Sequence, residues 1–148
     1  GFTKERLRQL RRLATAERQD GGSLADDPRF AEQVAELEVQ VKALEITQLR
    51  VAMAEAKRGA RAAPDPASSI LKLKGTELQQ AATAMLMRLA APYGMPDPFR
   101  LAGVNDAPDL PDVALHATPQ YLNWRKVSIY GGSNEIQRNI LAKAVLGL

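Results

Sequence analysis

The sequence predicts an all-α protein, most simply an antiparallel four-helix bundle. Apolar residues recur at steps of three and four over long stretches, which is the period of an amphipathic helix. Proline and glycine separate these stretches, and none of them shows the alternation of apolar and polar residues that is typical of a β-strand. Since the 148 residues are 45% hydrophobic, the chain can bury one core, and we expect a single domain.

Local signals mark the ends of the first three helices. Residues 2–18 form the first helix, which Gly21 and Gly22 end. Asp27 and Pro28 supply an N-cap and a proline at the first helical position of the second helix, which extends to Arg58. A second Asp-Pro pair at residues 65–66 begins the third helix, which ends at about residue 91. The residues expected to face the core are Leu7, Leu10, Ala14, Phe30, Val34, Leu37, Val41, Leu44, Ile70, Leu73, Ala81, Met85 and Leu89.

The last third of the chain is less regular. Residues 92–119 are rich in proline, aspartate and glycine, and we expect a long loop of the kind that is often functional. Residues 121–129 predict a short helix or an ordered turn. The fourth helix starts after Ser133 and is expected to bury Ile136, Ile140, Leu141, Ala144 and Val145.

Composition excludes several classes of function. The chain has no cysteine and one histidine, so we expect no disulfide framework, no metal site and no serine hydrolase triad. A reducing, cytoplasmic setting fits this composition. No run approaches the ~18 apolar residues of a membrane span, and the first residues are charged, so we expect a soluble protein. The net charge of +3 is dispersed, and we expect no binding of nucleic acid.

The stretch YGGSNEIQR, residues 130–138, raises a question of function. Ser133 or Asn134 can cap the last helix, and Glu135 suits the positive end of the helix dipole. The two preceding glycines have two interpretations. They either form an ordinary turn that needs positive φ, or they let an anionic group approach bare backbone N–H donors. Local chemistry leaves both open.

The last residues, IYGGSNEIQRNILAKAVLGL, resemble the C-terminal signature of the acyl-CoA dehydrogenase family, Tyr-Glu-Gly-Thr-Asn-Glu-Ile-Gln-Arg followed by an apolar helix. Residues 17–19, Glu-Arg-Gln, resemble the family's Glu-Arg-x-x-Phe-Gly turn, and residues 69–72 resemble its Ser-x-x-Lys. The resemblance covers almost the whole chain. It implies that residues 1–148 are the C-terminal helical bundle domain of a longer chain, whose N-terminal helical and middle β domains are absent here.

The resemblance also implies a function. The family's members are FAD-dependent oxidoreductases acting on CH–CH bonds, which desaturate an acyl-CoA thioester at the α,β bond in lipid metabolism. They are oligomers, and they pass electrons to an acceptor. This chain would supply oligomer contacts and part of the FAD site, and would be inactive by itself. By resemblance, Gly132, Ser133, Asn134 and Glu135 would meet the FAD pyrophosphate and ribose, and Arg18 would meet FAD bound to the partner subunit.

Two departures from the family pattern set limits on this function. The family's Gln-x-x-Gly-Gly, which holds the adenine, corresponds to residues 88–92, Arg-Leu-Ala-Ala-Pro. Gly131 stands where many members have the glutamate that removes the α-proton, so no catalytic residue is expected in this chain. The base would come from an upstream helix or a partner subunit. Two alternatives remain: a noncatalytic partner subunit of a hetero-oligomeric dehydrogenase, acting in assembly, and a helical binding module unrelated to flavin.

Overall fold

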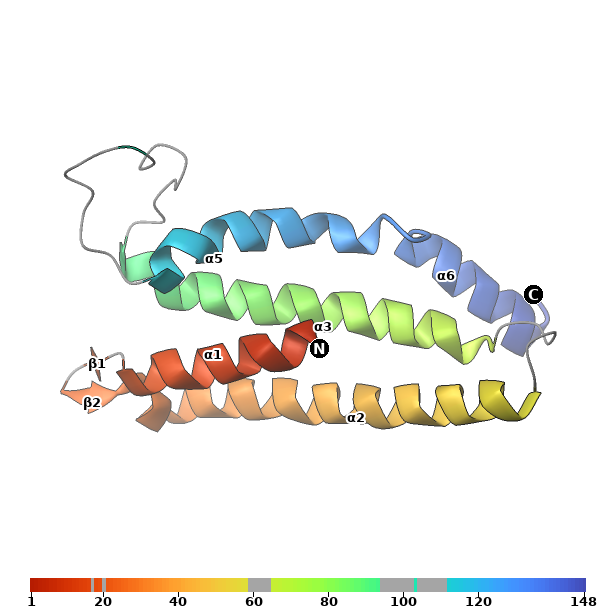
Figure 1. The fold of residues 1–148 in the computed structure, drawn as a ribbon, viewed down its shortest axis with the longest axis horizontal. Helices are drawn as coiled ribbons and strands as arrows, with labels where there is room; N and C mark the ends of the chain where they lie inside the picture. Colours follow the sequence, from red (N-terminus) through yellow and green to blue (C-terminus); the bar gives the residue numbers. More distant parts are fainter. Residues whose placement is uncertain (17, 20, 59–64, 94–102, 104–111) are drawn as a thin grey trace. The chain divides into compact units, whose positions relative to one another are not determined.

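The computed structural model describes residues 1–16, 18–19, 21–58, 65–93, 103 and 112–148, with residues 18, 19 and 112 described by their backbone alone. These residues form five α-helices, so the predicted all-α class is confirmed (Figure 1). The helices are α1 (Phe2–Ala16), α2 (Pro28–Arg58), α3 (Ala67–Ala90), α5 (Asp112–Asn123) and α6 (Asn134–Leu141). Three short 3₁₀ segments, η1 (Leu24–Asp26), η2 (Ala91–Tyr93) and η3 (Trp124–Ser128), and a π-helical turn, η4 (Ala142–Leu146), accompany them.

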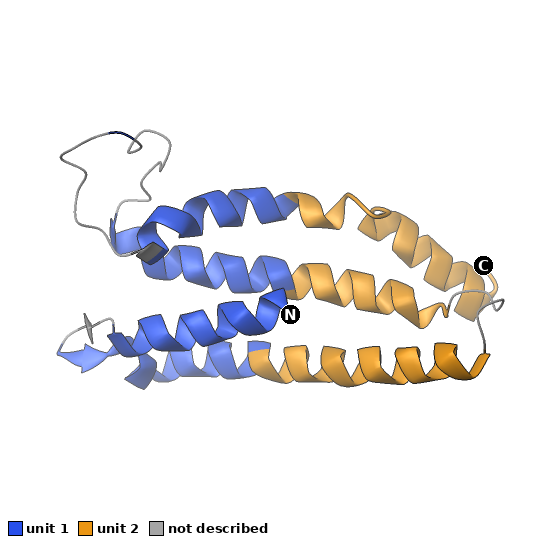
Figure 2. Ribbon diagram, in the orientation of Figure 1, with its two compact units in different colours: residues 1–37, 79–125 blue, residues 38–78, 126–148 orange. Residues whose placement is uncertain are grey.

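The chain divides into two compact units, shown in different colours in Figure 2. Unit 1 contains residues 1–37 and 79–125, and unit 2 contains residues 38–78 and 126–148. Helices α2 and α3 each contribute residues to both units.

Unit 1 is an antiparallel bundle of α1, the start of α2, the end of α3 and α5, whose chain direction reverses from each helix to the next (Figure 1). All four helices bury apolar side chains, as the spacing predicts for α1, α2 and α3. Leu10 is fully buried, and Trp124 stacks on Phe2 with ring centroids 4.0 Å apart. The buried apolar residues of this unit are Leu7, Leu10, Ala14, Val34, Leu37, Ala82, Met85, Leu86, Leu89, Ala90, Val113, Ala114 and Ala117.

The end of α1 carries a feature that the sequence did not predict. Strands β1 (Arg18–Gln19) and β2 (Gly22–Ser23) pair in an antiparallel ladder, although we expected helix up to residue 18 and no strand. Gly21 has a φ of +84°, which permits the tight turn between them. The Ser23 hydroxyl donates to the Ala14 carbonyl at 2.8 Å, so it satisfies one of the last carbonyls of α1.

Both Asp-Pro starts are confirmed as helix caps. The Asp27 side chain accepts from the Arg29 backbone N–H at 2.9 Å, and the Asp65 side chain accepts from the Ala67 backbone N–H at 2.9 Å. Asp65 also forms an ion pair with Arg58, the last residue of α2. Unit 2 buries Val41 and Val51 from α2, and Leu73 and Leu78 from α3.

Several predictions about the last third of the chain were wrong. The expected loop of residues 92–119 contains the start of α5 at residue 112, whereas its residues 94–102 and 104–111 lie outside the described chain. Pro119 lies inside this helix, and because proline usually breaks a helix, the sequence predicted a loop here.

Two residues of α3 were also expected to face the core, but Ile70 and Ala81 are exposed rather than buried.

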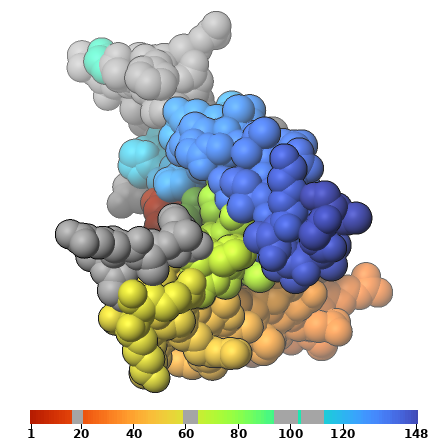
Figure 3. Space-filling view, turned by 90° about the vertical axis from the view of Figure 1, so that its right-hand side faces the viewer, coloured from red at the N-terminus to blue at the C-terminus, as the bar shows by residue number. Residues whose placement is uncertain are grey.

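The apolar face of the last helix was also expected to be buried, and it is not. Ile136, Ile140 and Val145 are 52%, 43% and 67% exposed, and Ala144 is exposed as well. Figure 3 shows this end of the chain, in the darkest blue, on the surface. The periodicity correctly marked which face is apolar, but within the described residues no element of unit 2 covers it.

Candidate functional site

The candidate site is the turn of residues 129–133 between η3 and α6, all of it in unit 2. The Ile129 backbone N–H donates to the Lys126 carbonyl at 2.9 Å, which closes η3. Gly131 and Gly132 follow with φ angles of +69° and +84°. These left-handed conformations favour glycine, so the interpretation of the glycines as a positive-φ turn is supported. A Cβ atom at Gly131 would meet no atom within 4 Å, so its outer face is open.

Helix α6 begins with a side-chain cap. The Ser133 hydroxyl accepts from the Ile136 backbone N–H at 3.4 Å, and the Ser133 carbonyl accepts from the Gln137 backbone N–H at 3.0 Å. Hydrogen bonds from its own backbone N–H and from the Ser133 hydroxyl lower the pKa of Glu135 below its ordinary value of 4.5. The first turn of α6 therefore already faces one carboxylate.

Asn134 faces the interior. It is 9% exposed, and its Oδ1 atom accepts from Lys72 Nζ at 2.7 Å and from Thr76 Oγ1 at 3.4 Å, both on α3. Lys72 Nζ also donates to the Ser128 carbonyl at 3.3 Å. In the sequence, Lys72 stands out only as part of the Ser-x-x-Lys pattern, and Thr76 carries no signal. Their contact with a residue about sixty positions away was invisible in a single sequence.

The remaining predicted site residues are placed as follows. Gly132, Ser133, Asn134 and Glu135 are consecutive and share the start of α6, whereas Arg18 belongs to unit 1, where its backbone is part of β1. Arg88, at the position of the family's glutamine, is exposed and donates to Gln33 Oε1 at 2.8 Å in unit 1. Its guanidinium serves a contact between α3 and α2 there.

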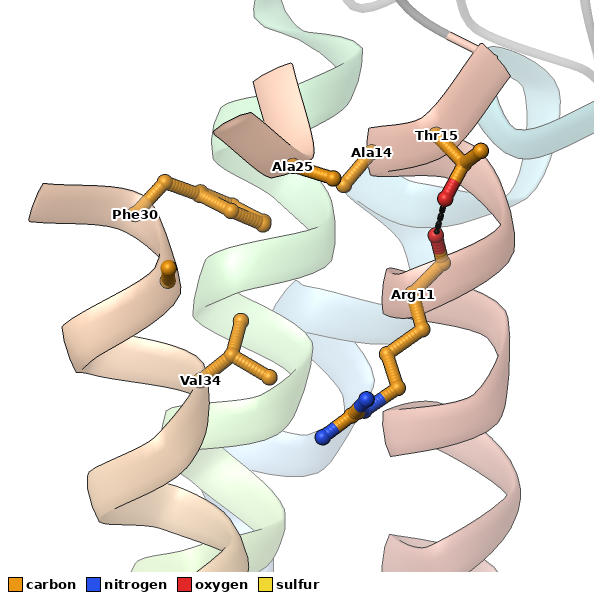
Figure 4. A pocket seen from close by; sticks show the side chains of 7 residues that line it. Arg11, Ala14, Thr15, Ala25, Phe30 and Val34 are labelled. Atoms are coloured by element: carbon orange, nitrogen blue, oxygen red, sulfur yellow. Dashed lines mark hydrogen bonds between the residues drawn. The ribbon is translucent and has the colours of Figure 1, made fainter. Parts of the chain in front are cut away.

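Each unit also has an open hollow. In unit 1, Phe30 and Val34 of α2 and Arg11 of α1 point into a hollow of about 170 Å³, which Ala14, Thr15, Ala25 and Ala31 complete (Figure 4). In unit 2, Leu44 and Ile70 are among the residues that line a mostly apolar hollow of about 450 Å³ between α2 and α3, with Lys74 on its wall. Neither hollow includes a residue of the turn 129–133.

The chemistry of the turn suits a nucleotide cofactor in part. Both glycines are exposed and the outer face of Gly131 is open, so a diphosphate can approach the backbone there, and the Glu135 carboxylate is an acceptor for ribose hydroxyl groups. Two observations limit the fit. The Asn134 side chain points inward, and the ionised Glu135 would repel a phosphate close to it. Backbone N–H groups would therefore hold the phosphates, and Glu135 would hold a sugar.

Structure comparison identifies the fold. A chain from the structure of the electron transferring flavoprotein of Acidaminococcus fermentans superposes with a TM-score of 0.75 at 16% identity, covering 98% of this chain and 33% of that one. A chain of the ChsE4-ChsE5 complex from Mycobacterium tuberculosis superposes with a TM-score of 0.75 at 22% identity, covering 99% and 35%. This chain thus spans about a third of the length of these two relatives.

Sequence comparison gives the family. No curated protein matches the chain. In the described part of the chain, no helix is long and apolar enough to cross a membrane. The family model for the C-terminal domain of acyl-CoA dehydrogenases matches residues 1–146. The chain therefore belongs to the acyl-CoA dehydrogenase family, as a C-terminal helical domain.

Proposed function

We propose that this chain is the C-terminal domain of a subunit of an FAD-dependent acyl-CoA dehydrogenase, which desaturates an acyl-CoA thioester at the α,β bond. The observation that carries the proposal is the start of α6, where two exposed glycines in positive-φ conformations precede a capped helix and an ionised Glu135. When bound, FAD supplies the hydride acceptor of such a reaction. The activity belongs to a longer protein, in which N-terminal helical and middle β domains would precede this one.

The roles proposed for the site residues combine the resemblance to the family with the geometry of the turn. Gly132 and Ser133 would present backbone N–H groups to the FAD pyrophosphate. Glu135 would accept hydrogen bonds from ribose hydroxyl groups, and Asn134 would act from the interior by fixing the helix start. Arg18 would reach FAD held by another subunit. The acceptor of the electrons would be a separate protein or small molecule.

The exposed apolar face of α6 and η4 supports a role in assembly. Ile136, Val145 and Leu146 are each more than half exposed. Exposed apolar patches are typical of interaction sites, including contacts between proteins. We propose that another dehydrogenase subunit, identical or different, covers it.

Two observations favour the second candidate, a noncatalytic partner subunit. Gly131 has no side chain to move a proton, and its φ of +69° is a conformation that a glutamate would adopt only with strain. The glutamine and glycines of the adenine contact are missing as well, and Arg88 binds Gln33 instead. In this version the chain keeps the bundle for assembly, and a different subunit provides the base.

An absorbance spectrum of the purified full-length protein separates these functions. Flavin bands in the protein alone, with reduction by acyl-CoA, support the dehydrogenase. Flavin bands that appear only with a co-encoded dehydrogenase subunit support the noncatalytic partner. Absence of flavin bands in both settings would contradict the dehydrogenase and the noncatalytic partner alike, and would favour the helical binding module unrelated to flavin.

A variant tests the assignment of the turn to FAD. Ser133→Ala combined with Asn134→Ala should lower flavin occupancy in the full assembly more than it lowers helix content, because cap loss alone costs only about 1 kcal/mol. Unchanged flavin occupancy in this double variant would reduce the glycine turn to a structural element.

A further inference from the structure

One ammonium group binds both ends of the glycine turn. Ser128 is the last residue of η3 and Asn134 is the first residue of α6, and Lys72 Nζ donates to the Ser128 carbonyl at 3.3 Å and to Asn134 Oδ1 at 2.7 Å. Residues 129–133 lie between these two anchors, with both glycines exposed. We call the contacts of Lys72 with Ser128 and Asn134 the lysine clamp. All three residues belong to unit 2.

The chemistry of the clamp requires a cation with several donors. The Ser128 carbonyl lies at the C-terminal end of η3, where a helix dipole favours positive charge. An ammonium has three N–H donors, so it can bind this carbonyl and the Asn134 amide oxygen together. Hydrogen bonds with an ionised donor are roughly twice as strong as neutral ones.

The clamp also determines which way Asn134 faces. Thr76 donates to the same Asn134 Oδ1 atom at 3.4 Å and to the Leu73 carbonyl at 2.9 Å. With two donors from α3 on its oxygen, the buried Asn134 side chain stays inside. The helix start is thereby kept in one orientation, and the exposed glycine backbone is its outer surface.

We propose that Lys72 is the positioning residue of the candidate cofactor turn, which it holds in a binding-competent shape from the interior without touching the ligand. The proposal rests on the proposed function in assigning the ligand of the turn as the diphosphate of FAD. The clamp itself is testable without any cofactor.

The first experiment measures amide hydrogen exchange of residues 129–137 in the cofactor-free, full-length protein. Lys72→Met keeps the unbranched apolar stem of the side chain, one atom shorter, and removes the charged donors, so exchange in this segment should become about tenfold faster. Lys74→Met is the matched control on the same helix, since Lys74 is exposed and pairs with Glu77 outside the clamp. It should leave exchange in residues 129–137 unchanged. Equal exchange in the Lys72→Met variant and the unmodified protein would overturn the proposal.

The second experiment tests whether the effect passes through Asn134. Asn134→Ala removes the acceptor and should also accelerate exchange, whereas Asn134→Asp keeps an oxygen for Lys72 and should preserve slow exchange. In the Lys72→Met background, Asn134→Asp should no longer exchange more slowly than Asn134→Ala. An advantage that persists without Lys72 would overturn the proposal. If Lys72→Met fails to fold, the Asn134→Ala and Asn134→Asp pair carries the test alone, and equal exchange in both overturns it.

Flavin retention then separates positioning from stability. In the full assembly, Lys72→Met should release flavin at a temperature below that of unfolding, whereas Lys74→Met should not. Fast exchange combined with unchanged flavin retention in Lys72→Met would overturn the positioning role. The assignment of the turn to FAD would fall if Ser133→Ala with Asn134→Ala also left flavin bound, and the proposed function itself would fall if the full-length protein bound no flavin, alone or with its partner subunit, so these failures are distinguishable from that of the lysine clamp.

Discussion

The side-chain amide of Gln137 lies against Gly132, so that a Cβ atom added to Gly132 would come within 2.6 Å of Gln137 Nε2. The same nitrogen donates to the Gly131 carbonyl at 3.4 Å. The first turn of α6 thus folds one side chain back over the glycines that precede it. An alanine at position 132 would displace this amide, which a flexible glutamine permits at little steric cost.

We predict that Gly132→Ala destabilises the protein by ~1–2 kcal/mol, because its φ of +84° is unfavourable for any residue with a Cβ atom. Gly75→Ala is the control, since Gly75 lies inside α3 and its added Cβ would sit 3.9 Å from Leu44 Cδ2, in ordinary contact. It should stabilise the protein by up to ~1 kcal/mol. Urea unfolding measures both, and equal effects of the two alanines would contradict the assigned turn.

A series at Gly131 tests the position of the missing base. Gly131→Ala and Gly131→Glu should each lower the free energy of unfolding by ~1 kcal/mol or more, because φ is +69°. Steric contacts should add nothing, since the space around the residue is open. Asn should cost less, since it tolerates the left-handed region. Chemical denaturation of the three variants gives the order. A Gly131→Glu variant as stable as the unmodified protein would show that the turn accepts a glutamate without strain.

The ionisation of Glu135 should depend on its cap. Its pKa is held below the ordinary 4.5 by its own backbone N–H and by the Ser133 hydroxyl. Ionised Glu135 therefore stabilises the folded chain above that value, and the contribution is lost as the pH falls through the lowered pKa. NMR titration of the carboxyl group should show the pKa rising in Ser133→Ala. Asp65 serves as the internal control: its pKa is lowered mainly by the Ala67 backbone N–H, and it should not respond.

Replacement of Arg125 by lysine should lower the stability of unit 1. Its guanidinium donates to the carbonyls of Gln80 and Tyr121 at 2.9 and 3.2 Å, and it stacks 4.3 Å from the centre of the Tyr121 ring. Lysine has neither the fixed fork of donors nor a planar face, so Arg125→Lys should cost ~2 kcal/mol in thermal or urea unfolding. The exposed Arg29 provides the comparison. A loss in Arg29→Lys as large as in Arg125→Lys would count against the role of the fork.

Helix ends were predictable where the signal is local. Asp27 and Asp65 bind N–H groups two residues away, and α2 ends at Arg58 as expected. Helix α5 was missed because Pro119 reads as a breaker, although a protein interior can hold a helix that contains one. The periodicity around Ile136 and Ile140 identified an apolar face but could not say whether the same chain covers it.

The local features of the site were also predictable, whereas its tertiary contacts were not. The glycines and Ser133 predicted a turn and a helix cap, because their conformational preferences are local. The inward orientation of Asn134 depends on Lys72 and Thr76, which adjoin it only after α3 and α6 have packed. Contacts of this kind follow from tertiary structure, and no local rule supplies them.

The π-helical turn η4 changes the direction of the apolar surface at the end of the chain. A π turn adds one residue to the helix, which rotates the following side chains by about 100° relative to a regular α-helix. Val145 lies five positions after Ile140, and the extra residue brings it to within about 40° of Ile140 around the helix axis instead of about 140°, whereas Leu146 still lies about 140° away. A single partner segment that runs along Ile136 and Ile140 would therefore also reach Val145, and the contact with Leu146 must come from another side.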